Sequence, residues 1–242
     1  MRKLDILTNS IQKKPLSHDL FEFGGEYDNM LHRGLKITGE DKHYFAEGRI
    51  RDLRSHLPHD FRPKRILDFG CGIGETTKLL AETFREAEII GVDTATNALA
   101  HAEKIYGSSR ISFCSFELFL ETGTIDLCYT NGVFHHIQPE ERAGVLKMIY
   151  RWLVLGGYFA LFENNPWNLG TRLVMKLIPF DRDAKPLTSS QSRRLLYETG
   201  FGYCAPARFL FYFPRLLAFL RFSESWMARL PLGAQYYILT RK

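Results

Sequence analysis

The fold is decided by the stretch from Arg65 to Glu75, which reads Arg65-Ile66-Leu67-Asp68-Phe69-Gly70-Cys71-Gly72-Ile73-Gly74-Glu75. Its apolar start predicts a buried strand, and Glu75 opens a segment whose apolar residues recur at helical spacing. The three glycines between them let the backbone turn tightly, adopt positive φ angles and approach a ligand without a Cβ in the way. A helix that begins after such a turn presents unpaired N–H groups, which suit a ligand with an anionic end.

The spacing of the glycines indicates which ligand the turn binds. Dinucleotide-binding folds carry G-x-G-x-x-G, whereas this chain has G-x-G-x-G with an acid, Asp68, two residues before the first glycine. The pattern resembles motif I of the class I, Rossmann-like S-adenosylmethionine-dependent methyltransferases. The resemblance implies that S-adenosylmethionine is the cofactor. The residues of this turn assigned to its binding are Asp68, Gly70, Cys71, Gly72 and Gly74.

A second predicted strand, over residues 87–93, ends at Asp93, which lies 23 residues beyond Gly70. A carboxylate at this position can accept hydrogen bonds from both ribose hydroxyls of an adenosine group, as an acidic residue does in dinucleotide-binding folds. We therefore assign Asp93 and its neighbour Thr94 to the cofactor site. The structural alternative for Asp93 is a helix-capping acid, and Thr94 or Thr96 is the expected N-cap of the next helix.

The ends of the third and fourth predicted strands complete the cofactor site. After residues 110–115 the family often places an acid or amide against the adenine amino group, whereas this chain has Ser115 and Phe116. We expect the ring of Phe116 to pack on the adenine face and Ser115 or backbone groups to meet its edge, with Glu117 as an alternative. Asn131 follows the fourth strand, over 125–130, where the resemblance places the backbone beneath the cofactor.

Two histidines, His135 and His136, come shortly after Asn131 in a segment that resembles the family pattern ending in a histidine pair. The resemblance implies that they point toward the region where the methyl group is delivered, so we assign them as the catalytic residues. One of them could act as a general base near neutral pH. The alternative is that both are structural and pack behind the loop.

The predicted fifth strand, over 158–163, runs into a polar turn, Glu163-Asn164-Asn165-Pro166-Trp167-Asn168. Part of it is faintly similar to the N/D-P-P-Y/F/W motif of enzymes that methylate nucleic-acid amines, but that motif follows the fourth strand. We expect the turn to line the acceptor pocket instead, and a rigid polar turn is the alternative. Together with two N-terminal tyrosines it gives the predicted acceptor residues Tyr27, Tyr44, Glu163, Asn164, Asn165 and Trp167.

The composition is that of an ordinary globular protein, with 242 residues of which 45% are hydrophobic and 24% charged. The net charge of +5 comes without a dense Lys/Arg block, so it permits an anionic acceptor or a membrane surface and does not favour nucleic acid. The four cysteines are far apart and form no CxxC pair, so we predict no metal site and a reducing, cytoplasmic location. We find neither a signal peptide nor an apolar run of about 18 residues that would span a membrane.

Predicted strands and helices alternate between residues 65 and 163, which indicates an α/β fold. The resemblance implies a doubly wound, mostly parallel sheet of seven strands in the order 3-2-1-4-5-7-6. We divide the chain into an N-terminal leader with cap helices, 1–58, and a methyltransferase domain, 59–242. Insertions on the acceptor side are expected at 167–187 and at 214–231, the second of them a helical insertion between the last two strands.

Residues 214–230, called the tail below, read as a basic amphipathic helix in which arginines alternate with leucine, phenylalanine and tryptophan. Such a helix can make a peripheral membrane contact or bind a partner. Packing on a lid over the acceptor, or on the face of a homodimer, is the alternative.

These observations favour an enzyme, an S-adenosylmethionine-dependent methyltransferase acting on oxygen of a small-molecule, glycan or lipid-linked acceptor. A sulfonium methyl group is already activated, so such a protein mainly has to align the acceptor and exclude water. An RNA methyltransferase, a non-catalytic cofactor-binding scaffold subunit and an NAD-dependent oxidoreductase are the competing hypotheses. The RNA methyltransferase is disfavoured because the polar-aromatic motif after the fourth strand is missing. The scaffold subunit is disfavoured because Asp68 and Asp93 are retained, and the oxidoreductase is disfavoured by the glycine spacing.

Overall fold

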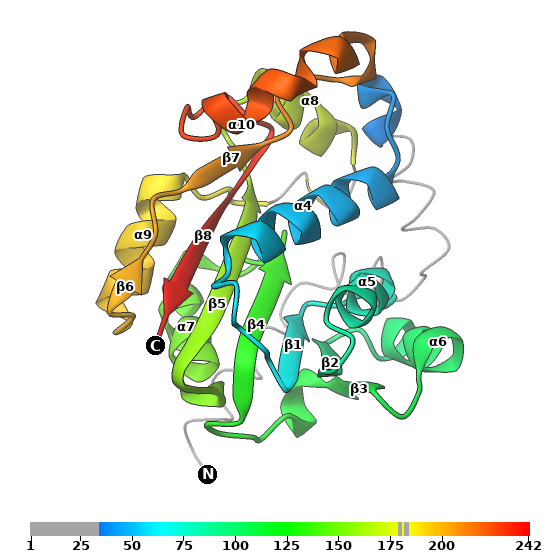
Figure 1. Cartoon of the computed structure of the whole chain (residues 1–242), viewed down its shortest axis with the longest axis vertical. Coiled ribbons are helices and arrows are strands. Elements are labelled where there is room, and N and C mark those ends of the chain that lie inside the picture. The colour runs from blue at the N-terminus through cyan, green and yellow to red at the C-terminus, as the bar shows by residue number, and fades with distance from the viewer. Residues whose placement is uncertain (1–33, 179–180, 182–183) are drawn as a thin grey trace.

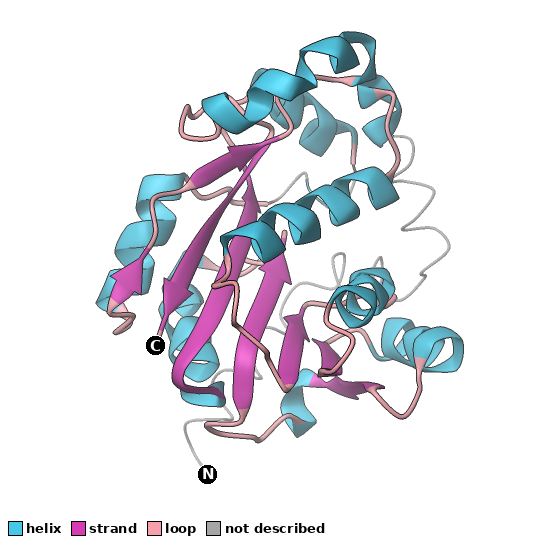
Figure 2. Ribbon diagram, viewed as in Figure 1, coloured by secondary structure: helices cyan, strands magenta, loops and turns pink. Residues whose placement is uncertain are grey.

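The computed structural model describes residues 34–178, 181 and 184–242. Tyr27, a predicted acceptor residue, lies outside them. The described chain is a sheet with helices on both faces (Figure 1; Figure 2). Its eight strands are β1 (Arg65–Phe69), β2 (Glu88–Asp93), β3 (Ile111–Ser115), β4 (Ile125–Asn131), β5 (Leu153–Asn164), β6 (Tyr203–Cys204), β7 (Arg208–Leu210) and β8 (Gln235–Arg241).

The strand order is β3-β2-β1-β4-β5-β8-β6, with β7 also paired to β8. Strands β1 to β5 are parallel, and β8 runs antiparallel to β5. The predicted α/β class and the mostly parallel order are therefore confirmed. Because parallel strands end at one edge of a sheet, Asp68, Asp93 and Asn131 are brought to the same side of the molecule.

The helices divide between the two faces of the sheet. Those of the described chain are α4 (Lys42–His56), α5 (Glu75–Thr83), α6 (Thr96–Tyr106), α7 (Pro139–Trp152), α8 (Leu169–Leu177), α9 (Ser189–Glu198) and α10 (Glu224–Met227), with the 3₁₀ segments η1 (Lys36–Thr38), η2 (Phe116–Leu118) and η4 (Arg215–Ser223). One core holds α4 and α5 against the sheet, and the other holds α7 and α9.

Alternation along β5 explains how one strand serves both cores. Phe159 and Leu161 face the core of α7 and α9, whereas Ala160 and Phe162 face that of α4 and α5. The proposed domain boundary at residue 58 falls just after α4, whose Leu53 is completely buried in the same core as β1 and β4.

Where the expected seven-stranded order has a single sixth strand, the structure has two short strands, β6 and β7. Strands β6 and β7 pair with opposite ends of β8, at Thr240 and Arg241 and at Gln235 to Tyr237, respectively. The break spans residues 205–207, whose central residue is Pro206. Since proline has no N–H to give to a ladder, it interrupts the pairing of a strand at its position.

The tail also differs from the regular helix predicted for it. It forms the 3₁₀ segment η4, with a non-helical backbone at Leu217 (φ −106°, ψ 23°), followed by the single α-helical turn of α10. No residue of η4 is buried. In Figure 1 it lies at one end of the molecule beside η1, and the ion pair between Arg221 and Glu40, at 2.9 Å, ties the two together. In the described part of the chain no helix has the length and apolar character that a membrane crossing needs.

Candidate active site

The three glycines of the turn between β1 and α5 have two different roles. Gly70, Gly72 and Gly74 have φ angles of +78°, +53° and +84°, the left-handed region that favours glycine. A Cβ on Gly70 would lie 2.2 Å from Val133 Cγ2, and one on Gly74 would lie 2.7 Å from Phe113 Cζ, so these two glycines are required by packing. A Cβ on Gly72 would meet nothing within 4 Å, so Gly72 is the glycine that borders open space.

Asp93 fastens this turn to the end of β2. Its Oδ2 accepts from Gly72 N at 2.8 Å, and its Oδ1 accepts from Thr94 N at 2.7 Å and Ala95 N at 3.0 Å. A carboxylate offers about four acceptor positions, so Asp93 retains capacity for a ligand hydroxyl while it shapes the loop. The predicted threonine cap is wrong: Ala95 is the N-cap of α6 and makes no side-chain cap, because Asp93 already accepts from the N–H groups before the helix.

Asp68 lies beneath the turn and is 2% exposed. Its Oδ2 accepts from Thr77 Oγ1 at 2.7 Å. Burial is the main reason that the pKa of Asp68 rises from 3.8 to about 7; the charge of Asp93 adds to the rise, while the hydrogen bond from Thr77 and the charge of Arg49 oppose it. Asp68 therefore titrates near neutral pH.

Arg49 was missed by the sequence reasoning. It is 6% exposed on α4, and its guanidinium donates to Tyr129 Oη at 3.1 Å and to Gln235 Oε1 at 3.0 Å. Gln235 in turn donates to Asn164 Oδ1 at 3.1 Å, so this predicted acceptor residue belongs to a polar network that joins α4, β4, β5 and β8. The sequence does contain an indication of its role, because Arg49 lies next to Ile50 on the apolar stripe of α4.

Asn131 ends β4 and carries an unusual atom. Its Oδ1 is buried and has no hydrogen-bond partner. The next residue, Gly132, has a φ of +69° and donates from its N–H to Phe162 O at 3.1 Å. A buried acceptor without a donor is rare in folded proteins and calls for an explanation such as a bound ligand.

Four polar side chains converge beyond Asn131, from the loop after β4, the end of β5 and the segment before α9. His135 Nδ1 lies 2.7 Å from Glu163 Oε2, and the N–H of Phe134 donates to Glu163 Oε1 at 2.8 Å. On the other side, His135 Nε2 and His136 Nε2 lie 3.5 and 3.4 Å from the same atom, Asp181 Oδ1. We call these residues, His135, His136, Glu163 and Asp181, the histidine cluster.

The electrostatics of the histidine cluster distinguish its two imidazoles. Burial lowers the pKa of His135, but the carboxylates of Glu163 and Asp181 outweigh it and raise this pKa to about 10. Burial dominates for His136 and lowers its pKa. The contacts with both histidines overcome burial at Asp181 and lower the pKa of its carboxyl. His135 is thus a charged group held between carboxylates, and the neutral His136 is the better proton acceptor.

Two predicted adenine contacts lie beside Asp93. Ser115 pairs with Asp93 in the register of β2 and β3. The ring of Phe116 packs edge-on against Phe69 and Trp152, with centroid distances of 5.9 and 6.2 Å. Phe116 is therefore anchored in the core at the same edge of the sheet, and its contact with adenine stays a prediction.

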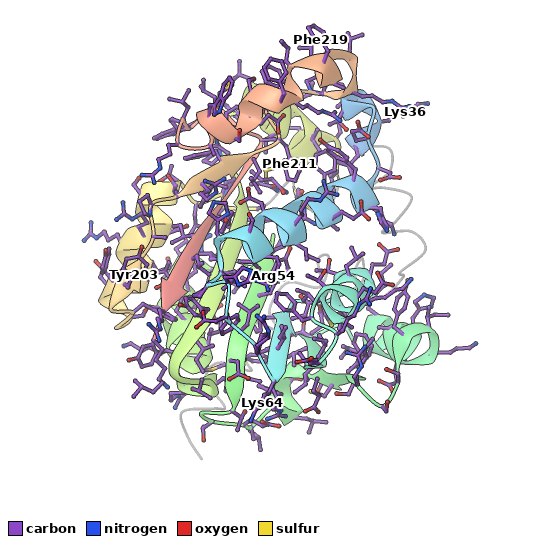
Figure 3. The ribbon with its side chains drawn as sticks, in the orientation of Figure 1. Lys36, Arg54, Lys64, Tyr203, Phe211 and Phe219 are labelled. Carbon is purple, nitrogen blue, oxygen red and sulfur yellow. The ribbon has the colours of Figure 1, made fainter. Side chains whose placement is uncertain are left out.

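Two of the predicted acceptor residues, Asn165 and Tyr44, make structural contacts, and a third, Trp167, is exposed. The amide of Asn165 donates to Pro231 O and Gly233 O at 3.0 and 2.8 Å and accepts from Trp167 N at 3.1 Å, so its hydrogen-bonding atoms are engaged in holding the turn. Trp167 is 58% exposed. Tyr44 packs beneath the tail, with Arg221 Cζ 4.7 Å from its ring centroid and Phe211 beside it; Figure 3 shows Phe211 between α4 and the tail. The sequence pattern cannot distinguish such anchoring residues from pocket residues.

Comparison with known proteins shows that part of this chain is similar to methyltransferases. A family model described as a methyltransferase domain matches residues 67–161. Trans-aconitate 2-methyltransferase of Rhodopseudomonas palustris (strain BisB5) is 26% identical over 157 residues, which are 64% of this chain and 60% of the relative. Phosphoethanolamine N-methyltransferase 1 of Triticum aestivum is 29% identical over 143 residues, 54% of this chain and 28% of the relative. The chain thus spans less than two thirds of these curated relatives.

Solved structures show the same fold. A SAM-dependent methyltransferase from Archaeoglobus fulgidus superimposes with a TM-score of 0.65 at 18% identity, covering 84% of this chain and 95% of its own. Phosphoethanolamine N-methyltransferase 2 of Haemonchus contortus, solved with S-adenosyl-L-methionine, gives 0.64 at 17% identity, covering 93% and 60%. With the strand order, these matches show that the chain has the fold of S-adenosylmethionine-dependent methyltransferases, and the family model shows that residues 67–161 are similar to a methyltransferase domain.

Proposed function

We propose that this chain transfers a methyl group from S-adenosylmethionine to an oxygen atom of a small-molecule, glycan or lipid-linked acceptor. The observation that carries the proposal is the buried, unpartnered Oδ1 of Asn131, at the same strand edge as the open side of Gly72. Leaving such an atom unsatisfied costs about 1–3 kcal/mol. Its presence therefore supports a ligand that donates a hydrogen bond there, and S-adenosylmethionine has ammonium, hydroxyl and amino donors.

The residues that would hold the cofactor lie at the ends of neighbouring strands. Gly72 leaves room for it, Asp93 retains acceptor capacity for a ribose hydroxyl, and Asn131 supplies the free carbonyl oxygen. Asp68 is close enough to this edge for its charge to interact with that of Asp93, so an ammonium group nearby would favour its ionised form. Cys71, Thr94, Ser115 and Phe116 complete the proposed surroundings.

The histidine cluster is the proposed acceptor side. S-adenosylmethionine supplies a methyl group that is already activated as a sulfonium, so the protein's residues have to align the acceptor and take up its proton. His136 is the member suited to accept that proton, since burial lowers its pKa and so favours the neutral imidazole, the form that can take up a proton. His135, clamped by Glu163 at 2.7 Å, would position its neighbour rather than act as the base. An oxygen acceptor fits this assignment because a hydroxyl or carboxyl group gives up a proton on methylation.

The proposed acceptor class is supported by the names of the relatives and by the exposed surface of the tail. By their names, the curated relatives act on trans-aconitate and phosphoethanolamine, which supports a small molecule. A lipid-linked acceptor is supported by the tail, whose Leu216, Phe219, Phe222 and Trp226 are 70–88% exposed. We place the protein in the cytoplasm, where its four free cysteines would stay reduced, with peripheral membrane contact through the tail. A homodimer that covers the same surface is the competing assignment.

Calorimetric titration with S-adenosylmethionine tests the cofactor assignment. Gly72→Ala should weaken binding at least tenfold, because the new Cβ enters the open space. Gly123→Ala is the matched control: Gly123 also has a positive φ, +64°, and nothing within 4 Å of its Cβ position, but it lies before β4 at the other end of the strand. Asn131→Ala should weaken binding about two- to tenfold, the value of one hydrogen bond. Absence of binding by the wild-type protein would overturn the proposed function.

A further inference from the structure

We propose that the histidine cluster is a binding site for a divalent transition-metal ion, with His135, His136 and Asp181 as ligands and Glu163 as the group that orients His135. The ligand atoms of the three residues lie within 4.8 Å of one another. The sequence reasoning predicted no metal site, because it considered cysteine pairs and these ligands come from separated segments. The proposal stands on the geometry of the cluster and does not depend on methyl transfer; an ion bound at His136 Nε2 occupies the lone pair of that nitrogen, so with metal bound this atom does not act as the base.

The distances within the cluster favour an ion over direct ion pairs. A charge-assisted N–H···O hydrogen bond is about 2.7–2.9 Å long, and His135 makes such a bond with Glu163, at 2.7 Å. Its contact with Asp181, and that of His136, are longer, at 3.5 and 3.4 Å. Ligand atoms bound at about 2.1 Å to one tetrahedral ion lie roughly 3.4 Å apart. The two long contacts to Asp181 therefore have the length expected between ligand atoms of one tetrahedral metal ion.

Glu163 has the position of the carboxylate that supports a metal-binding histidine. It is completely buried, and it accepts from Phe134 N at 2.8 Å as well as facing His135 Nδ1. The bond to Nδ1 fixes the orientation of the ring and directs Nε2 toward Asp181. Metal-binding histidines in proteins commonly donate their second ring N–H to a carboxylate in this way.

The donor set and its charge select the class of ion. Two imidazoles and one carboxylate suit zinc and the other divalent first-row transition metals, whereas magnesium and calcium prefer oxygen ligands throughout. A dication balances the two carboxylates, Glu163 and Asp181, when both imidazoles are neutral. His135 and Asp181 are buried, while the side chain of His136 is 26% exposed, which gives the ion a route of entry.

Cobalt(II) is the probe for the first test, because its visible absorption reports the coordination number. The full-length protein, freed of metal with a chelator, should bind one equivalent of cobalt(II) and then exchange it for zinc(II). Asp181→Asn and His136→Ala should each weaken binding at least tenfold, and Glu163→Gln by about 10–100-fold, as expected for a residue that orients a ligand. Each variant is first compared with the wild type by circular dichroism and thermal unfolding without metal.

His43→Ala is the matched control. His43 lies 3.6 Å from Glu47 in an exposed pair on α4, so it offers the same residue types without a converging site and should leave cobalt binding unchanged. Equal binding by the wild type, Asp181→Asn and His136→Ala would mean adventitious surface binding and would overturn the proposal, as would no binding by the folded wild-type protein. If the wild-type protein binds cobalt(II) but does not bind S-adenosylmethionine, the proposed function is contradicted and the proposed metal site is not.

Discussion

At the scale of single residues, burial and neighbours decide what each carboxylate of the site does. Asp68 is buried with one hydroxyl donor, Thr77, and the pKa of its carboxyl rises to about 7. Asp181 is buried beside two imidazoles, and its pKa falls. The same residue type is therefore available as a neutral-pH acid beneath the glycine turn and as a permanent anion beside the histidines.

Asp68 should make the stability of the free protein depend on pH. Because its folded pKa, about 7, lies above its usual value of 3.8, the folded state holds the proton more tightly. This contribution is complete below about pH 4 and is lost as the pH rises through about 7. Between these limits the free energy of unfolding of the wild type should fall relative to that of Asp68→Asn, by about 4 kcal/mol at most.

Urea unfolding of both proteins at pH 5 and pH 8, without cofactor, measures this difference. Other titrating groups affect both proteins alike, so they cancel in the comparison. An equal difference between wild type and Asp68→Asn at the two pH values would show that Asp68 has an ordinary pKa.

Asn165 should matter for stability rather than for acceptor binding. Its amide donates two hydrogen bonds that hold the turn after β5 against Pro231 and Gly233, and it accepts a third from Trp167 N within the turn; Asn165 is 2% exposed. Asn165→Ala should lower the free energy of unfolding by about 2–4 kcal/mol, because it removes these bonds and leaves buried carbonyl groups without donors. Asn164→Ala, which loses one bond to Gln235, should cost about 1 kcal/mol. A normal unfolding curve for Asn165→Ala combined with a changed acceptor KM would restore the pocket assignment.

At the scale of secondary-structure elements, the tail is the feature that packing leaves unexplained. Four of its large apolar side chains, Leu216, Phe219, Phe222 and Trp226, are 70–88% exposed, and Figure 3 shows Phe219 at the outer end of the molecule. The nearby helix α8 exposes Leu169, Leu173 and Leu177 as well, and its N-cap, Asn168, donates from Nδ2 to the carbonyl oxygen of Leu232, two residues beyond the tail, at 2.7 Å. Apolar surface of this extent indicates a binding face.

Flotation with lipid vesicles should distinguish the two occupants proposed for this face. The wild-type protein should float with vesicles containing phosphatidylglycerol, because the exposed aromatic groups insert and the chain's net charge is +5. Changing Phe219, Phe222 and Trp226 to serine should abolish flotation. The control changes three equally exposed leucines elsewhere to serine: Leu118, Leu120 and Leu155, which are 74–90% exposed. Equal flotation of both variants would remove the membrane contact, and a dimer that the tail variant alone loses would assign the face to a second copy.

At the scale of the whole molecule, the proposed cofactor site joins the ends of several strands into one unit. Asp93 of β2 bonds to the turn after β1, and Arg49 links α4 to β4 and β8. A ligand bound across these elements should stabilise the folded state as a whole. At a concentration 100 times its Kd, S-adenosylmethionine should add about 2.7 kcal/mol, which raises Tm by roughly 5–10 °C for a chain of this size.

Differential scanning fluorimetry with and without S-adenosylmethionine measures this shift. Gly123→Ala should respond like the wild type, and Gly72→Ala should respond much less at the same ligand concentration. A shift of the same size in both variants would contradict the placement of the ligand over Gly72.

Much of the fold was predictable because its signals are local. The glycine spacing, the apolar run before it and the alternation of strands and helices lie in contiguous sequence, and β2 ends at the predicted residue, Asp93. The prediction was wrong where one residue overrode the pattern. Pro206 splits the sixth strand, and the backbone at Leu217 breaks the predicted helix of the tail.

By itself the sequence determined the α/β class and the edge of the sheet where Asp68, Asp93 and Asn131 gather, because backbone conformation and strand periodicity follow from neighbouring residues. Only the tertiary structure decided which polar residues meet. Arg49 and Asp181 reach the site from segments far from the glycine turn, and Asn165 turns away to hold residues 231–233. Contacts between distant segments, and the burial and neighbouring charges that set the pKa values of Asp68 and the histidines, arise when the whole chain packs, so no local pattern records them.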